Sequence, residues 1–64
     1  MSTEKLVDRH GVREITAISP AYMYELIGKG LFPRPIRCGK RSFWLHTEIL
    51  SWIEGRRNER DAAK

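Results

Sequence analysis

The stretch "PRPIRCGKRSFW", residues 33–44, limits most strongly what this chain can fold into. Pro33 and Pro35 force extended backbone and exclude a helix in the middle of the sequence. The short runs "IRC" and "SFWL" then flank "GKR", in which Gly39 supplies turn geometry, and this pattern is typical of a β-hairpin. Prolines in the first strand indicate a sheet edge, so we expect the hairpin to project from the domain.

The hairpin carries positive charge without any acid. From Leu26 to Thr47 the chain has no Asp or Glu, and the formal net charge of the whole sequence is +4. The cations of this window are Lys29, Arg34, Arg37, Lys40 and Arg41. A one-signed patch on a small domain attracts polyanions, and nucleic acid is the first candidate. The alternative is a solvated basic surface that serves only solubility.

A short helix is predicted ahead of the hairpin, over residues 9–17. Asp8 is a suitable N-cap, because its carboxylate can accept from the free backbone N–H groups of the first turn. Val12 and Ile15 are three residues apart and therefore face one side. The preceding apolar residues Leu6 and Val7 are interpreted as anchors for this helix.

A second helix is predicted to begin at Ser19-Pro20, with the serine as N-cap and the proline at the first helical position. Met23, Leu26 and Ile27 form its apolar stripe. The helix is expected to end at "GKG", where Gly30 suits the left-handed C′ position. Because only residues 17–19 separate the two helices, the pair is interpreted as a helix-turn-helix.

A last helix is predicted from about Thr47, a plausible N-cap, with Glu48 in its first turn. Its apolar stripe is Ile49, Trp52 and Ile53. After Gly55 the sequence "RRNERDAAK" has no apolar residue except alanine, so we expect it to fray or to stay solvated. The predicted organisation is a DNA-binding domain over residues 1–55 and a polar C-terminal tail over residues 56–64.

With 64 residues the chain is one small domain near the lower limit for an independent core. The predicted core is Val12, Ile15, Ile18, Met23, Leu26, Ile27, Phe32, Ile36, Trp44, Ile49, Trp52 and Ile53. The two tryptophans are interpreted as core residues in preference to stacking platforms for bases. The order helix, tight turn, helix, hairpin, helix predicts a small α+β winged helix-turn-helix fold.

Several classes of function are not indicated by the sequence. No hydrolase, kinase or dinucleotide motif is found, so we expect neither an enzyme nor a cofactor. Cys38, His10 and His46 match no metal-ligand spacing. One cysteine allows no internal disulfide, which favours a reducing setting. No apolar run approaches the roughly 20 residues that span a bilayer, and the N-terminus has no apolar signal region, so we expect a cytoplasmic, nucleoid-associated protein.

The residues also resemble a known family. The order "SPAYMYELIxxGxFPxPI", followed by "GKRSFW" and "EILSWI", resembles the AlpA-type phage regulators, small relatives of the excisionases and of MerR-like winged helices. The resemblance covers about Leu6 to Ile53. It implies a DNA-binding regulator of a prophage or integrated element. Some members control an integrase gene, and others are excisionases that bend attachment-site DNA and recruit a tyrosine integrase.

The resemblance maps a recognition helix onto residues 19–29 and a wing onto residues 36–45. The candidate DNA-binding residues are Ser19, Ala21, Tyr22, Tyr24, Glu25, Lys29, Arg37, Lys40, Arg41 and Ser42. Lys40 and Arg41 are expected to contact phosphates or the minor groove. Tyr22 points away from the apolar stripe and is either a DNA contact or a plain surface tyrosine, whereas Tyr24 is expected to be half-buried.

This sequence departs from the family at three places in the helix-turn-helix. Pro20, Ala21 and Tyr22 occupy the exposed early positions of the recognition helix, where the family often has Arg, Ser or Thr. Glu25 stands where a basic residue is common, and it can either accept from a cytosine amino group or repel phosphate. Ala17 stands where the family usually has a turn glycine.

The tail offers Arg56, Arg57 and Arg60 as partner-binding candidates, with a solvated end as the alternative. Because no apolar surplus remains for a dimer face, we expect a monomer in solution and side-by-side copies on repeated DNA sites. Our leading hypothesis is an excisionase that directs a tyrosine integrase towards excision. The rivals are a transcriptional regulator without recombinase contact and a module that docks an acidic protein partner.

Overall fold

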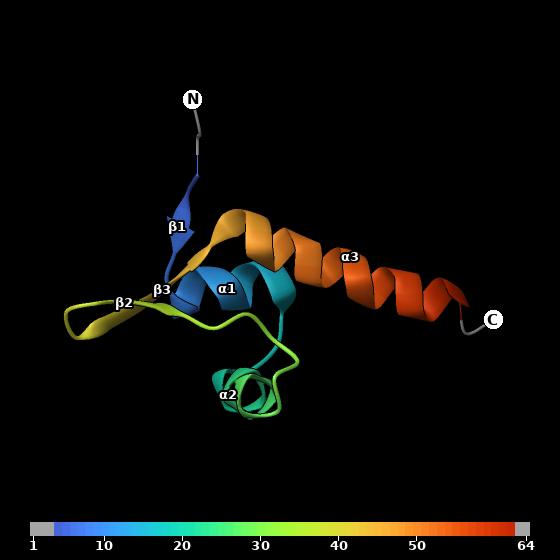
Figure 1. The fold of residues 1–64 in the computed structure, drawn as a ribbon, viewed down its shortest axis with the longest axis horizontal. Coiled ribbons are helices and arrows are strands. Elements are labelled where there is room, and N and C mark those ends of the chain that lie inside the picture. The colour runs from blue at the N-terminus through green and yellow to red at the C-terminus, as the bar shows by residue number, and fades with distance from the viewer. Residues whose placement is uncertain (1–3, 63–64) are drawn as a thin grey trace.

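The structure, a computed structural model, describes residues 4–62 and confirms the predicted order of elements. The elements are β1 (Leu6–Val7), α1 (Arg9–Thr16), α2 (Pro20–Gly28), β2 (Ile36–Cys38), β3 (Arg41–Leu45) and α3 (His46–Ala62). In Figure 1, α1 lies beside the first turns of α3, α2 is seen end-on below them, and the hairpin projects on the opposite side from the end of α3. The fold is a small α+β winged helix.

The two predicted N-caps are both present. The Asp8 carboxylate accepts from the backbone N–H of Gly11 at 2.9 Å, and the Ser19 hydroxyl accepts from the N–H of Tyr22 at 3.2 Å. Each cap satisfies one backbone donor that the first turn of a helix leaves without an intrahelical partner. The caps fix where α1 and α2 begin.

The turn between α1 and α2 is built on a left-handed residue. Helix α1 ends at Thr16, one residue earlier than predicted, because Ala17 has φ 65° and ψ 11°. Within residues 4–62 it is the single non-glycine residue with positive φ. The Ala17 N–H still donates to the carbonyl of Arg13 at 2.7 Å. A side chain in this conformation costs roughly 1–2 kcal/mol, so the tight turn is locally strained.

Helix α2 ends in a Schellman motif. Lys29 is the C-cap, and Gly30 follows with φ 74°, as predicted for a left-handed C′ glycine. The Gly30 N–H donates to the carbonyl of Ile27 at 3.0 Å, and the Leu31 N–H donates to that of Leu26 at 2.9 Å. This cap turns the chain from α2 towards the hairpin.

The sheet is antiparallel with the order β1-β3-β2, so β2 is an edge strand as expected. Its hairpin turn is shorter than predicted, because Arg41 already belongs to β3 and pairs with Cys38. Gly39 has φ 65°, which supplies the predicted turn geometry. Strand β1 was not predicted, since Leu6 and Val7 were interpreted only as anchors. They pair with Leu45 and Trp44.

The core lies between α1, α2, β3 and the first turns of α3. Its buried residues are Val12, Met23, Leu26, Phe32, Trp44 and Ile49. Around them pack the partly buried Val7, Ile15, Ile18, Ile27, Trp52 and Ile53. The prediction that Ile36 belongs to the core is wrong. Its exposed fraction is 40%, because β2 is the outer strand of the projecting hairpin.

Both tryptophans pack with the core, as predicted: Trp44 is fully buried and Trp52 is partly buried. The Trp44 indole N–H donates to the carbonyl of Pro33 at 3.0 Å, and that of Trp52 donates to the carbonyl of Leu31 at 2.9 Å. The Phe32 and Trp52 rings meet edge to face, with their centroids 4.9 Å apart. Each indole therefore combines apolar burial with a satisfied polar group, and together they tie the loop between α2 and β2 to the rest of the domain.

Helix α3 departs from the prediction at both ends. It begins at His46, and the Thr47 hydroxyl donates to the Glu4 carboxylate at 3.0 Å instead of capping the helix. It also continues through Ala62, so the expectation that the chain frays after Gly55 is wrong for residues 56–62. These residues are all exposed, as expected for a solvated segment. The last two residues of the predicted tail lie outside the described part of the chain.

Candidate nucleic-acid interface

The exposed face of α2 carries most of the predicted recognition residues. Ser19 and Ala21 are exposed, and the exposed fractions of Tyr22 and Tyr24 are 43% and 45%. Slightly more than half of Tyr24 is thus covered, which is close to the half-buried position expected from the sequence. Both tyrosine rings are accessible to a ligand that approaches α2.

Glu25 and Lys29, two further candidates on α2, pair with each other. The Lys29 ammonium lies 3.2 Å from the Glu25 carboxylate, and both side chains are more than half exposed. An exposed pair of this kind contributes about 0–1 kcal/mol, so either partner can be released to another ligand at low cost. In the free protein the pair leaves little net charge on this part of α2.

The register of the hairpin assigns its residues to two faces. Arg37 lies opposite Ser42, whereas Cys38 lies opposite Arg41 and Ile36 lies opposite Phe43. Directly paired residues share a face and successive pairs alternate. Arg37 and Ser42 therefore lie on one face of the hairpin and Arg41 on the other, a register that the sequence alone did not fix.

An acid from elsewhere in the chain does reach the wing. The Arg41 guanidinium lies 3.2 Å from the second carboxylate oxygen of Asp8, and it also lies over the Phe43 ring at 5.1 Å. The hydrogen bond from Gly11 and the positive charges of His10 and Arg41 lower the pKa of Asp8 from its ordinary value of 3.8. Sequence reasoning missed this contact, since the two residues are 33 positions apart.

A cleft of about 330 Å³ lies where the first turn of α1, the wing and α2 meet. Its lining residues are Asp8, Arg9, His10, Tyr24, Lys40, Arg41 and Ser42. Four of these were predicted as DNA-binding residues from the wing and α2. Arg9 and His10 were not, because nothing in the local sequence of α1 distinguishes a cleft residue from any other exposed residue.

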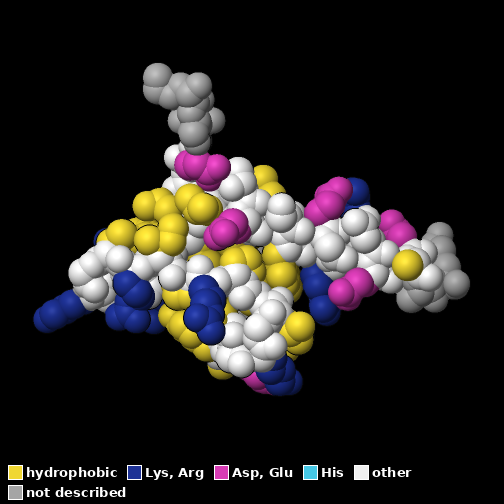
Figure 2. Space-filling model, in the orientation of Figure 1, with side chains coloured by type: hydrophobic (Ala, Val, Ile, Leu, Met, Phe, Trp, Pro, Cys, Tyr) yellow, Lys and Arg dark blue, Asp and Glu magenta, His cyan; other side chains and the backbone are white. Residues whose placement is uncertain are grey.

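The two charge types are distributed differently over the surface. Figure 2 shows Lys and Arg side chains without acidic ones over the projecting hairpin, whereas acidic and basic side chains lie together along α3 and at the lower edge of the molecule. Arg34, in the loop before β2, is also exposed. The hairpin and the loop before it thus form one cationic side, as the acid-free window of the sequence indicates, whereas α2 carries the Glu25–Lys29 pair.

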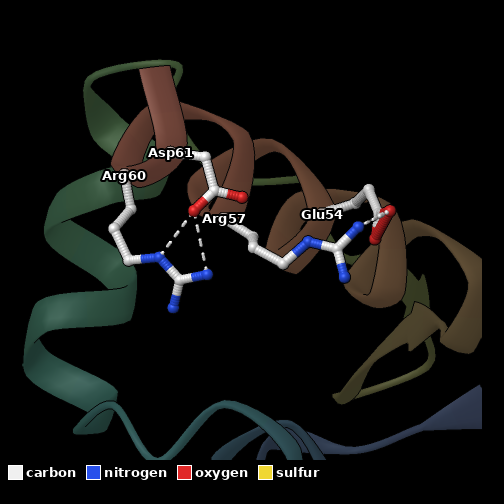
Figure 3. A network of polar contacts seen from close by, with 4 residues as sticks. All are labelled: Glu54, Arg57, Arg60 and Asp61. Atoms are coloured by element: carbon white, nitrogen blue, oxygen red, sulfur yellow. Dashed lines mark hydrogen bonds and ion pairs between the residues drawn. The ribbon is translucent and has the colours of Figure 1, made fainter. Parts of the chain in front are cut away.

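The partner-binding candidates of the tail, unlike most cations of the hairpin, form ion pairs with neighbouring acids. Arg57 lies 2.6 Å from Glu54, and Arg60 lies 3.0 Å from Asp61 (Figure 3). Arg56 pairs with Glu59 at 3.4 Å and also lies 5.8 Å from the centroid of the Trp52 ring. Each of the three arginines therefore has a carboxylate partner on the same helix. Their role in binding a partner protein stays a prediction.

The described residues 4–62 hold no group of three or more His, Cys, Asp and Glu side chains arranged for a metal ion. No helix in that range has the length and apolar character needed to cross a membrane. Apolar side chains do remain at the surface: Leu6, Leu31 and Leu50 have exposed fractions between 47% and 56%. Single exposed leucines are common on monomeric proteins, so the expected monomeric state stays a prediction.

Comparison with known proteins places the chain in a family. Residues 5–57 match the family model described as prophage CP4-57 regulatory protein (AlpA). The uncharacterized protein ORF88 of Enterobacteria phage P4 is 41% identical over 46 residues, which is 70% of this chain and 52% of that protein. This chain thus spans about half the length of that relative, and no solved structure matches it. The protein belongs to the AlpA family of phage regulatory proteins.

Proposed function

We propose that this protein is a sequence-specific DNA-binding protein of a prophage or integrated element, and that it acts there as an excisionase. The AlpA family is one of DNA-binding regulators, which agrees with the expectation of a non-enzymatic protein. The observation that carries the proposal is the exposed face of α2 beside a cationic, projecting hairpin. This pair of elements suits duplex DNA, because a helix reads base edges in the major groove while a wing contacts the backbone.

In the proposed complex, α2 enters the major groove with its N-terminal half towards the bases. Ser19, Ala21 and Tyr22 occupy the exposed early positions of the helix. None of them is an arginine, so base reading relies on shape, apolar contact and the tyrosine hydroxyl. Glu25 accepts from a cytosine amino group once Lys29 leaves it for a phosphate. Arg37, Lys40, Arg41 and Ser42 hold the backbone from the wing.

The salt dependence of DNA binding tests this proposal. Four to six phosphate contacts predict a slope of log affinity against log salt of about −4 to −5. Fluorescence anisotropy with a duplex from the flanks of the encoding element measures that slope, and footprinting on the same DNA locates the site. An affinity that stays constant between low and moderate salt would contradict DNA binding by this surface.

The excisionase role requires a partner as well as DNA. We propose a tyrosine integrase as that partner, with residues 56–62 of α3 as its contact, because this segment extends away from the domain (Figure 1). An in vitro excision assay with the cognate integrase tests the role. Stimulation of excision by the wild-type chain, and its loss in the triple variant Arg56→Ala, Arg57→Ala, Arg60→Ala with DNA binding unchanged, are the expected results.

A transcriptional regulator without recombinase contact is the second candidate. The family description itself favours it, because the matched family is named for regulation. Both roles use the same DNA-reading surface, so binding data do not separate them. No stimulation of excision, together with altered transcription from a promoter that contains the footprinted site, would assign the protein to this second role.

The proposed place of action is the nucleoid, where the protein meets DNA as a monomer and fills repeated sites with neighbouring copies. Analytical ultracentrifugation of the free protein tests the first point, and the steepness of binding to DNA with one or two sites tests the second. A dimer in the absence of DNA would contradict the expected state and would direct attention to the exposed Leu31 and Leu50.

A further inference from the structure

We propose that the cleft between the first turn of α1 and the wing is a seat for one phosphate of the DNA backbone, in which Arg9 and His10 act together with Lys40 and Arg41. This inference rests on the proposed DNA binding and adds a third element to the interface. Neither Arg9 nor His10 belongs to the recognition helix or the wing. Their contribution follows from the fold, which brings the start of α1 against the hairpin.

The cleft gathers phosphate-binding groups from three elements. Arg9 and His10 come from α1, Tyr24 comes from α2, and Lys40 and Arg41 come from the wing. Guanidinium, ammonium, imidazole and phenol groups all donate hydrogen bonds to anionic oxygens. Because Arg9 and Lys40 have no carboxylate partner within residues 4–62, both are available to an anion that enters.

The charge balance of the cleft favours an anion even though one carboxylate lies in it. Three cations, Arg9, Lys40 and Arg41, face the single acid Asp8, which leaves a formal charge of +2 with His10 neutral. Both oxygens of the Asp8 carboxylate already have a hydrogen-bond donor. One accepts from the Gly11 N–H at 2.9 Å, and the other accepts from Arg41 at 3.2 Å. An anion in the cleft would therefore bind to side chains and not to the backbone N–H groups at the start of α1, where Asp8 caps the helix.

Asp8 acts as an internal stand-in for the phosphate. Its carboxylate holds the Arg41 guanidinium towards the cleft in the free protein, at the same kind of contact that a phosphate oxygen would make. The pair is solvent-accessible, with Arg41 67% and Asp8 33% exposed, so it exchanges partners at low cost. When DNA binds, a backbone phosphate replaces Asp8 as the partner of Arg41. The same phosphate also accepts hydrogen bonds from the side chains of Arg9 and His10, and the Asp8 carboxylate accepts from neither of these side chains.

The test compares two arginines of the same helix. Arg9 lines the cleft, whereas Arg13 is exposed one turn later on α1 and does not line it. Binding of a mixed-sequence 20-bp duplex is measured by anisotropy as a function of salt for the wild type, Arg9→Ala, Arg9→Lys and Arg13→Ala. We expect Arg9→Ala to lower affinity about threefold to tenfold and to reduce the steepness of the salt slope by about 0.9. Arg13→Ala should leave the slope unchanged, and Arg9→Lys should restore it.

A second pair of variants tests the role of Asp8. Asparagine is as good an N-cap as aspartate, so Asp8→Asn removes the competing charge and keeps the start of α1. Glu14→Gln removes an exposed acid of the same helix outside the cleft. We expect Asp8→Asn to tighten binding of the same duplex more than Glu14→Gln does. Circular dichroism spectra check that every variant is folded.

The outcomes separate this inference from the proposed function. If the wild type binds the duplex but Arg9→Ala and Arg13→Ala behave alike, the phosphate seat is wrong and DNA binding stands. Equal effects of Asp8→Asn and Glu14→Gln would overturn the stand-in role of Asp8. If the wild type binds no duplex at all, the proposed function fails and this inference fails with it.

Discussion

The wing and the C-terminal half of α3 have similar shares of arginine and lysine but opposite electrostatic characters. In the tail segment, Arg56, Arg57 and Arg60 each pair with a carboxylate of the same helix. In the wing, the strands and their turn contain no acid, and one carboxylate reaches them, from Asp8 at the start of α1. The cations of the tail are neutralised locally, whereas those of the wing keep most of their field.

The comparison teaches that counting cations is a poor guide to a nucleic-acid surface. Surface ion pairs within one helix contribute a few tenths of a kcal/mol each, enough to support a helix, and they cancel much of the field that the paired cations would otherwise project. What distinguishes the wing is the exclusion of acids from its own sequence and its position beside the exposed tyrosines of α2. Placement and pairing of charge, more than its amount, determine which surface attracts DNA.

The largest expected effect comes from removing cations in matched pairs from the two regions. Lys40→Ala with Arg41→Ala should weaken DNA binding about 30-fold, since two charge-assisted contacts of about 1 kcal/mol each are lost. The salt slope should become shallower by about 1.8. Arg56→Ala with Arg57→Ala removes the same charge and should change affinity less than threefold. Salt titrations by anisotropy give both values, and equal losses in the two double variants would remove the distinction.

A glycine-to-alanine substitution should change the free energy of unfolding in opposite directions in the two regions. Gly39 has positive φ in the wing turn, so Gly39→Ala should destabilise the fold by about 1–2 kcal/mol. Gly55 lies inside α3 with no atom within 4 Å of an added Cβ, so Gly55→Ala should stabilise the helix by about 0.5–1 kcal/mol. Urea unfolding at pH 7 measures both changes. Two changes of the same sign would show that one of the turn and helix assignments is wrong.

An effect smaller than that of Gly39→Ala is expected at the turn of the helix-turn-helix. Ala17→Gly relieves the left-handed strain at φ 65° but adds freedom to the unfolded chain, so the net stabilisation should be about 0.5–1 kcal/mol. The thermal unfolding midpoint should rise by a few degrees. Ala21→Gly on the exposed side of α2 is the control, and it should lower the midpoint because α2 is helical there.

The smallest effect concerns the charge of Asp8. Because the hydrogen bond from the Gly11 N–H, and to a smaller extent the nearby His10 and Arg41, lower the pKa of Asp8 in the folded structure, the stabilisation from its charged form is present above the ordinary value of 3.8 and is lost as the pH falls through the folded value. Asp8→Asn lacks this contribution at every pH. The difference in unfolding midpoint between wild type and Asp8→Asn should therefore shrink below about pH 4. If the difference in midpoint between wild type and Asp8→Asn grew as the pH was lowered, the charged form of Asp8 would not stabilise the fold as inferred.

Much of the fold could be predicted from the sequence because local signals mark its boundaries. Ser19-Pro20, Gly30 and Gly39 each require one backbone geometry, and the structure has a helix start, a Schellman cap and a hairpin turn at these positions. Strand β1 could not be predicted, since two residues are too few to show alternation. The tail helix was missed because apolar periodicity is absent there, whereas ion pairs and propagation from an existing helix extend α3.

The residues of the candidate site could be predicted only where they lie on a single helix or strand. The exposed positions of α2 follow from helical periodicity, whereas the faces of the hairpin required the strand register that the structure supplies. The contact between Asp8 and Arg41 and the cleft that includes Arg9 depend on how β1 and α1 meet the wing, and this is a property of the tertiary fold. The wrong assignment of Ile36 to the core has the same cause, because its exposure depends on which neighbours the fold supplies.

One measurement tests the central claim most directly: backbone amide chemical shifts recorded while a duplex from the flanks of the encoding element is titrated into the protein. The account predicts shifts in the first turn of α1, along α2 and in the wing, at Arg9, Tyr22, Lys40 and Arg41 above all. Residues 56–62 should be unaffected. Shifts confined to the tail helix, with the wing unchanged, would contradict the account.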